Sequence, residues 1–228
     1  MVPPVTDVAA VVFDLDGLLL DSEQVWSAAK ERLVQERGGR WTDAAAQDML
    51  GMSSTEWANY MRDELRVPLD ADAISAEVVR IMQELYEAEL PILPGADGAV
   101  RRIATRWPLG LASSSNREII DLVLRRAGWS ELFQATVSSE EVARGKPSPD
   151  VYLEAIRRLG VRPRLAVAVE DSTPGIRSAH AAGLAVVAIP NAGLPPEPEL
   201  LAETEVLASL DELDASAVER AAAEEEGT

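Results

Sequence analysis

Two aspartates stand directly after a short apolar run near the start of the chain. The stretch AAVVFDLDGLLLDSE covers residues 9–23 and places Asp14 and Asp16 immediately after the apolar run Val8–Phe13. Two carboxylates this close repel each other unless a cation lies between them, and Mg²⁺ prefers hard oxygen ligands of this kind. A turn with helix-capping aspartates is the simpler alternative when this motif is considered alone.

Three further segments carry polar side chains that suit a phosphate ester and a cation. Ser113–Asn116 follows an apolar run, the stretch RGKPSPD contains Lys146, and Glu170 and Asp171 follow another apolar run. A serine at a helix N-terminus suits a phosphate oxygen, and a lysine offsets the charge of several carboxylates. Each segment also has a structural alternative, because serines and acidic residues cap helices and surface lysines are solvated.

The elements that must position these motifs follow an alternating pattern of strands and helices. Apolar runs predict buried parallel strands at Val8–Phe13, Leu109–Ala112, Leu165–Val169 and Ala185–Pro190. Helical spacing of apolar residues predicts helices at Arg117–Ala127, Pro149–Leu159 and Gly175–Ala182. The carboxyl ends of parallel strands form the ligand crevice of an open α/β sheet, so the four polar loops should converge on one point.

The segment 22–90 differs, because it contains no strand-like run. Its stretches, such as ISAEVVRIMQELYEAEL, carry apolar residues at helical spacing. We therefore predict an α/β fold: a Rossmann-like parallel sheet flanked by helices, formed by 1–21 and 91–228, with 22–90 inserted as an all-helical cap domain. The C-terminal stretch ERAAAEEEGT is expected to be frayed or disordered.

Composition narrows the classes of partner. The 228 residues carry a formal net charge of −18, no cysteine and a single histidine, His180. This charge disfavours nucleic acid and anionic membranes, and no stretch is apolar enough for a membrane span. A single histidine argues against a His-based triad or a multi-histidine zinc site. We expect a cytoplasmic monomer or weak dimer that acts on a small molecule.

The order of the motifs carries a family resemblance. FDLDGLLLDSE, LASSSN, GKPSPDVY and VEDSTPGIRSAHAAG resemble the four motifs of the haloacid dehalogenase superfamily, in the branch with a helical cap after the first strand. The resemblance implies Mg²⁺, with Asp14 as a nucleophile that forms an aspartyl-phosphate and also binds the metal. Asp16 would be the acid/base and would bind the metal through its backbone carbonyl. Asp171 would bind the metal directly, and Glu170 would bind it or support a residue that does.

The same resemblance supplies the remaining candidates. It implies that Ser113, Ser114 and Lys146 bind the transferring phosphoryl group. The stretch LGMSSTEW is similar to the substrate-specificity loop of the cap, and DSEQVW is similar to segments of sugar-phosphate and hexitol-phosphate phosphatases. The candidate substrate contacts in the cap and at the rim are Trp26, Gly51, Ser53, Ser54, Ser115, Asn116 and Arg117.

The expected activity is hydrolysis of a small phosphorylated metabolite, a sugar or polyol phosphate. A hexose-phosphate mutase of the β-phosphoglucomutase type is the alternative. Those mutases place a histidine where this sequence has Trp26, and an arginine in the cap near the position of Ser53 and Ser54. A catalytically inactive binding module would be expected to have lost the nucleophile or the lysine, and both are present.

Overall fold

The computed structural model describes residues 8–49, 52, 54–191 and 195–225, so the predicted substrate contacts Gly51 and Ser53 lie outside the described residues. Its centre is a sheet of six strands, all parallel, in the order β3-β2-β1-β4-β5-β6. The strands are β1 (Ala10–Phe13), β2 (Leu109–Ser113), β3 (Phe133–Ser138), β4 (Ala166–Glu170), β5 (Ala185–Ala188) and β6 (Glu205–Val206). The predicted α/β fold class is confirmed.

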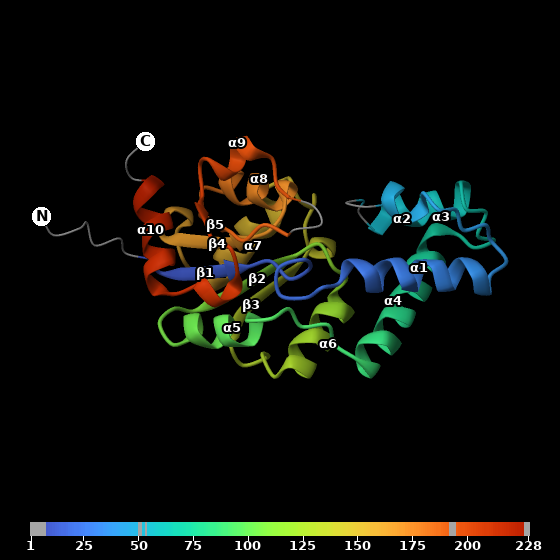
Figure 1. The fold of residues 1–228 in the computed structure, drawn as a ribbon, viewed down its shortest axis with the longest axis horizontal. Helices are drawn as coiled ribbons and strands as arrows, with labels where there is room; N and C mark the ends of the chain where they lie inside the picture. The colour runs from blue at the N-terminus through green and yellow to red at the C-terminus, as the bar shows by residue number, and fades with distance from the viewer. Residues whose placement is uncertain (1–7, 50–51, 53, 192–194, 226–228) are drawn as a thin grey trace, which may run out of the picture.

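Helices cover both faces of this sheet because successive strand residues point to opposite sides. Val11 and Phe13 join one apolar core with the helices α5, α6 and α10, whereas Val12 joins a second core with α7 and α8 (Figure 1). These helices are α5 (Ala96–Ala104), α6 (Arg117–Ala127), α7 (Asp150–Leu159), α8 (Thr173–Ala181) and α10 (Ala215–Glu225). The remaining short elements are η1 (Ser139–Glu141), η2 (Pro163–Leu165), α9 (Pro198–Leu201) and η3 (Leu210–Glu212).

Among the described residues between β1 and α5, the regular elements are helices, and isolated β-bridges join Leu20 to Asp16 and Ile92. These helices lie at the end of the molecule opposite α10 (Figure 1). They are α1 (Glu23–Glu36), α2 (Ala45–Asp48), α3 (Ser54–Asp63) and α4 (Ala71–Ala88), and α4 packs against both α1 and α3. Two chain crossings join this segment to the sheet and lie side by side, since the Asp21 amide donates to the Pro91 carbonyl at 2.9 Å. The division into a core and a cap domain at 21/22 and 90/91 stays a prediction.

Two parts of the chain depart from expectation. The strand β3 was not predicted, because FQATVS places polar Gln134 and Thr136 among its apolar residues. The expectation of a frayed C-terminal stretch is wrong for its described part: α10 is helical to Glu225, because Ala217, Val218 and Ala221 form a buried stripe against the sheet. No helix in the described part of the chain is both long and apolar enough to span a membrane.

Candidate active site

A buried lysine links two carboxylates at the carboxyl edge of the sheet. Asp14 follows β1, Glu170 ends β4, and Lys146 lies in the loop before α7. The Lys146 Nζ atom is 2.6 Å from Asp14 Oδ1 and 2.6 Å from Glu170 Oε1. The Tyr152 hydroxyl of α7 also donates to Glu170 Oε1, at 2.8 Å. The predicted convergence of the motifs that carry these residues is therefore present in the structure.

Burial and like charges give this cluster unusual electrostatics. Burial, with help from the neighbouring Glu170 carboxylate, raises the pKa of Asp14 to about 7, although Lys146 acts in the opposite direction. Burial and the carboxylates of Glu170 and Asp14 raise the pKa of Asp171 well above its usual range. Burial alone would lower the pKa of Lys146, but Asp14 and Glu170 outweigh it and raise that pKa. A single lysine does not offset three carboxylates, so the cluster favours an additional cation.

The donor set at this edge fits a divalent cation with hard oxygen ligands. Oxygen atoms of Asp14, Glu170 and Asp171 all lie within 4.8 Å of one another. The Asp171 Oδ1 atom is buried and has no hydrogen-bond partner among the described residues, which is costly unless an ion or water satisfies it. Gly17 shapes the cradle from the side: its φ is +83°, and a Cβ there would lie 2.3 Å from Asp171 Oδ2. These residues could therefore hold a metal ion through carboxylate oxygens.

Asp16 lies beside this cluster and receives three donors. The Ser115 hydroxyl donates to Asp16 Oδ2 at 2.7 Å, and the Ser113 hydroxyl donates to the same atom at 3.3 Å. The third donor comes from the helical segment, because the Trp26 indole N–H of α1 donates to Asp16 Oδ1 at 3.3 Å. Asp16 is therefore held in place from both the sheet side and the helical side.

A cavity of about 380 Å³ opens over these residues and extends between the helical segment and the sheet. Its walls at the sheet end include Asp14, Asp16, Ser114, Ser115, Lys146 and Asp171. At the opposite end they include Trp26, Lys30, Met49, Met52, Ser54 and Trp57. This volume lies within the range typical of small-molecule sites, and its two ends have different character: charged at the sheet, largely apolar at the helices.

Comparison with known proteins decides the family. A family model described as haloacid dehalogenase-like hydrolase matches residues 11–189. The chain belongs to this family. It is 31% identical over 215 residues to hexitol phosphatase B of Escherichia coli (strain K12), which covers 91% of this chain and 95% of that protein. The predicted family and its hydrolase class are confirmed.

Two further matches extend the comparison. The haloacid dehalogenase-like chain is 32% identical over 185 residues to the bifunctional riboflavin kinase/FMN phosphatase of Arabidopsis thaliana, which covers 80% of this chain but only 48% of that longer protein. Among solved structures, CbbY from Rhodobacter sphaeroides in complex with phosphate superposes with a TM-score of 0.83 at 27% identity. That superposition covers 92% of this chain and 99% of CbbY.

The loop Ser113–Asn116 of this hydrolase is fixed by hydrogen bonds from the end of β3 and the start of η1. The Ser138 hydroxyl donates to the Ser115 carbonyl at 2.6 Å, and the Ser139 hydroxyl donates to the Ser114 carbonyl at 3.0 Å. The Ser113 hydroxyl accepts the Ser115 amide at 2.9 Å. These bonds hold the loop open toward the cavity, with Ser114 and Ser115 in its wall.

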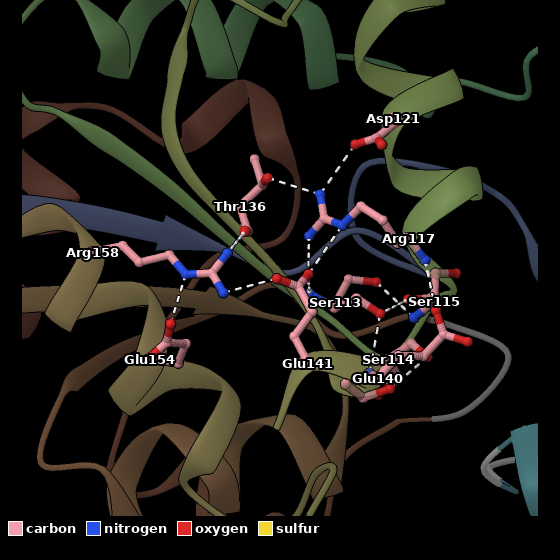
Figure 2. Close-up of polar contacts among 12 residues, drawn as sticks. Ser113, Ser114, Ser115, Arg117, Asp121, Thr136, Glu140, Glu141, Glu154 and Arg158 are labelled. Atoms are coloured by element: carbon pink, nitrogen blue, oxygen red, sulfur yellow. Dashed lines mark hydrogen bonds and ion pairs between the residues drawn. The ribbon is translucent and has the colours of Figure 1, made fainter. Parts of the chain in front are cut away.

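The side chains of Asn116 and Arg117, two of the predicted substrate contacts, bind other residues of the chain. The Arg117 guanidinium donates to Glu141, to Asp121 at 3.1 Å and to Thr136 at 2.9 Å, as Figure 2 shows. The Asn116 amide donates to Glu140 at 2.6 Å. Among the described residues, neither side chain is part of the cavity wall, so the structure does not bring Asn116 and Arg117 to the substrate site. Their contacts instead tie the start of α6 to η1.

Two residues of the haloacid dehalogenase-like site were missed by the sequence analysis. Tyr152 was read only as part of the apolar stripe of its helix, although its hydroxyl contacts Glu170. Lys30 was not considered at all, because a lysine on an amphipathic helix is usually solvated. The signal for Lys30 was present in the composition: the chain has 21 basic side chains, and only Lys30 and Lys146 among them are lysines.

Proposed function

We propose that this enzyme hydrolyses the monophosphate ester of a small sugar or polyol derivative, with Mg²⁺ and through an aspartyl-phosphate on Asp14. The observation that supports this best is the cluster in which Lys146 joins Asp14 to Glu170 beside the buried, unpartnered Asp171 oxygen. Phosphoryl transfer needs a positioned nucleophile and compensating charge, and this cluster provides both. The hexitol phosphatase and FMN phosphatase relatives support the phosphatase class.

In the first half of the reaction, a carboxylate oxygen of Asp14 attacks the phosphorus atom. The bond from phosphorus to the ester oxygen breaks, and Asp16 gives its proton to that leaving oxygen. The hydroxyls of Ser113 and Ser115 and the Trp26 indole hold the Asp16 carboxyl in position for this transfer. The products of this half are the free alcohol, an ionised Asp16 and the acyl phosphate on Asp14.

In the second half, the ionised Asp16 takes a proton from a water molecule as that water attacks phosphorus. The bond from phosphorus to the Asp14 oxygen breaks, which restores the Asp14 carboxylate and releases inorganic phosphate. Lys146 favours the ionised form of Asp14 before the attack and orients its carboxyl group. Asp14, Asp171, the Asp16 carbonyl and Glu170 are the candidates to hold Mg²⁺, which when bound supplies charge neutralisation for the phosphoryl group.

The proposed substrate class follows from the shape and lining of the cavity. Its helical end presents Trp26 and Trp57, whose ring centroids lie 6.3 Å apart, together with Met49 and Met52. Indole faces and thioethers pack well against the carbon skeleton of a sugar or polyol. The named relatives agree, since a hexitol phosphate and FMN both carry their phosphate on a linear polyol chain.

The test is release of inorganic phosphate from a panel of sugar, polyol and nucleoside monophosphates, with Mg²⁺ and after exhaustive chelation. Asp14→Asn should abolish turnover and prevent the appearance of an acyl phosphate by mass spectrometry. Asp43→Asn, at an exposed position outside the cavity, is the matched control and should leave both unchanged. No phosphate release from any monophosphate, p-nitrophenyl phosphate included, would contradict the proposal.

The same assay separates hydrolysis from the mutase alternative. We expect β-glucose 1-phosphate, incubated with a bisphosphate primer, to give free phosphate with little glucose 6-phosphate. The reason is that the mutases have a histidine at this position, whereas Trp26 offers one N–H donor and cannot accept a proton. Faster formation of glucose 6-phosphate than of free phosphate would favour the mutase. A cytoplasmic location, a monomeric or weakly dimeric state and the lack of nucleic-acid or membrane partners stay predictions.

A further inference from the structure

The chain uses lysine at only two positions, and both line the same cavity. Of its 21 basic residues, 19 are arginines, and the two lysines are Lys30 and Lys146. Lys146 is fully engaged by Asp14 and Glu170 at the sheet end of the cavity. Lys30 is the cation at the helical end, where the proposed function has so far assigned only apolar walls. Its surroundings therefore bear on what part of a substrate lies there.

Lys30 is buried between two indoles. The residue is 8% exposed. Its Nζ atom is 5.2 Å from the ring centroid of Trp57 and 5.8 Å from that of Trp26. Cation–π contacts of this kind stabilise an ammonium, but they do not accept its N–H bonds as oxygen atoms do. An ammonium has three N–H donors. The indoles therefore hold the Lys30 side chain in place but leave its N–H groups without an oxygen acceptor in the described part of the chain.

The contacts of Lys30 include no carboxylate within the described residues. No described hydrogen bond or ion pair joins its Nζ atom to a protein oxygen, and burial is the only influence on its pKa, which it lowers to about 8. The side chain thus keeps its proton at neutral pH. Glu23 and Glu56 also line the cavity, but at exposed positions. A buried cation without a counter-ion at the wall of a substrate cavity is most readily explained as the receptor of an anion.

One indole separates this cation from the reacting groups. The N–H edge of Trp26 contacts Asp16 at 3.3 Å, and the ring of the same residue lies 5.8 Å from Lys30 Nζ. A short carbon chain with its phosphate at Asp14 would therefore run along the indole of Trp26 and have its far end near Lys30. The distance between the two ends of such a substrate is set by a single side chain.

We propose that Lys30 binds a carboxylate at the end of the substrate remote from the phosphate, which makes a phosphorylated sugar acid the substrate class. This inference rests on the proposed function and narrows it. A carboxylate suits the site better than a hydroxyl, because a charge-assisted hydrogen bond is about twice as strong as a neutral one. A carboxylate also neutralises the buried ammonium, which a hydroxyl does not. The net charge of −18 adds a reason for such a receptor, since a substrate with two anionic groups needs a local positive group for each of them.

The test uses two substrates that differ only at the remote end. 6-Phosphogluconate carries a carboxylate where sorbitol 6-phosphate carries a hydroxymethyl group, and the rest of the chain is the same. We expect the wild type to prefer 6-phosphogluconate in kcat/KM. Lys30→Met should reduce kcat/KM for 6-phosphogluconate about 10- to 100-fold, the usual range for a hydrogen bond to a charged group. It should change kcat/KM for sorbitol 6-phosphate by less than about threefold, since that neutral end makes the weaker bond.

Arg32→Met is the matched control, because it removes a cation from the same helix at an exposed position and should leave the preference unchanged. Binding of the two compounds to the Asp14→Asn variant with Mg²⁺, by calorimetry, makes the result independent of turnover. Tighter binding of 6-phosphogluconate that Lys30→Met abolishes would support the inference even if neither compound is hydrolysed. Equal binding, or a preference that survives Lys30→Met, would overturn it and leave the proposed phosphatase activity intact.

Discussion

The two ends of the cavity hold the same side chain in opposite surroundings. At the sheet end, the Lys146 side chain is 6% exposed and carboxylates raise its pKa. At the helical end, Lys30 is 8% exposed and burial lowers its pKa to about 8. Similar burial therefore gives shifts of opposite sign, and the difference lies in the partners. The sheet provides two carboxylates to its lysine, whereas the helices provide two indole faces.

This difference indicates what each end is built to receive. Lys146 is held beside the nucleophile by its pairs with Asp14 and Glu170, and its role in binding the phosphoryl group stays a prediction. A lysine on indole faces keeps its charge for a ligand. The sheet end accordingly fits the invariant part of the reaction, the phosphoryl group, and the helical end fits the part that distinguishes one substrate from another.

Removing the paired lysine should have the largest effect. Lys146→Met leaves Asp14 and Glu170 buried without their counter-charge, so we expect unfolding to become easier by about 3–5 kcal/mol, the usual penalty for breaking a buried pair. Activity should fall at least ~100-fold, because the pKa of Asp14 is already about 7 and loses the influence that lowers it. Urea denaturation and phosphate release measure the two effects.

The control for this variant is Arg144→Met, two residues before Lys146 in the sequence. The Arg144 side chain is 71% exposed and forms an ion pair with Asp150. We expect changes within about 0.5 kcal/mol for such an exposed pair. Equal effects of the two substitutions would show that Lys146 is an ordinary surface lysine. The contrast between the two ends of the cavity would then disappear.

The sheet end could be predicted from the sequence because topology places it. Asp14, Ser113 and Asp171 each follow an apolar run, and the carboxyl ends of parallel strands meet at one edge. The order of the motifs was enough to bring them together without any knowledge of side-chain packing. The loop with Lys146 was included among the converging loops because it precedes a predicted helix, although the strand before it was not detected.

The helical end could be predicted only in part: Trp26 and Ser54 were named and lie in the cavity wall, but the position of Lys30 depends on packing between helices. Lys30 lies one turn after Trp26 on α1, which sequence spacing gives, but Trp57 comes from α3 and its position depends on how the helices cross. For Arg117, the place next to Ser113–Asn116 suggested substrate contact, which stays a prediction, and in the structure Glu141 and Thr136 hold its guanidinium. Tertiary partners decided both cases.

The second prediction concerns Asp16, which receives donors from both ends. Asp16→Asn should fold and bind substrate but lower kcat by about 10²- to 10⁴-fold, the usual contribution of general acid–base catalysis. The loss should be the same for 6-phosphogluconate and sorbitol 6-phosphate, because Asp16 acts on the ester oxygen and not on the remote end. Steady-state kinetics with both substrates measure this, and a loss confined to one of them would place Asp16 in recognition instead of catalysis.

The third prediction concerns how much the burial of the charged Lys30 lowers the free energy of unfolding. Its folded-state pKa of about 8 lies below the ordinary value of 10.5, so the unfolded chain binds more protons between these two pH values. Stability should therefore rise as pH increases from about 8 to 10.5, and below pH 8 the penalty is at its full size of about 3 kcal/mol. Lys30→Met should stabilise the protein at pH 7 by up to this amount, less the lost cation–π contacts.

Guanidinium denaturation of wild type and Lys30→Met at pH 7 and again near pH 10.5 measures this effect. The gain should be clear at pH 7 and should be small near pH 10.5, where the folded-state lysine is neutral and half of the unfolded-state lysines have lost their proton. Arg32→Met, on the same helix, should show no such pH dependence. A destabilising Lys30→Met at pH 7 would mean that the ammonium already has a strong partner, and the contrast with Lys146 would fail.

The smallest expected effect concerns Trp26, whose side chain contacts Asp16 at one end and Lys30 at the other. Trp26→Phe removes the N–H donated to Asp16 but keeps an aromatic face beside Lys30. One lost hydrogen bond of ordinary strength corresponds to about a three- to tenfold decrease in kcat. The KM values and the ratio of kcat/KM between the two substrates should hardly change, because Lys30 keeps its aromatic neighbours.

Trp26→Ala removes the aromatic face as well and should raise KM for both substrates. An unchanged kcat in Trp26→Phe together with a lost substrate preference would show that Trp26 serves the helical end alone, and the two ends would then be independent.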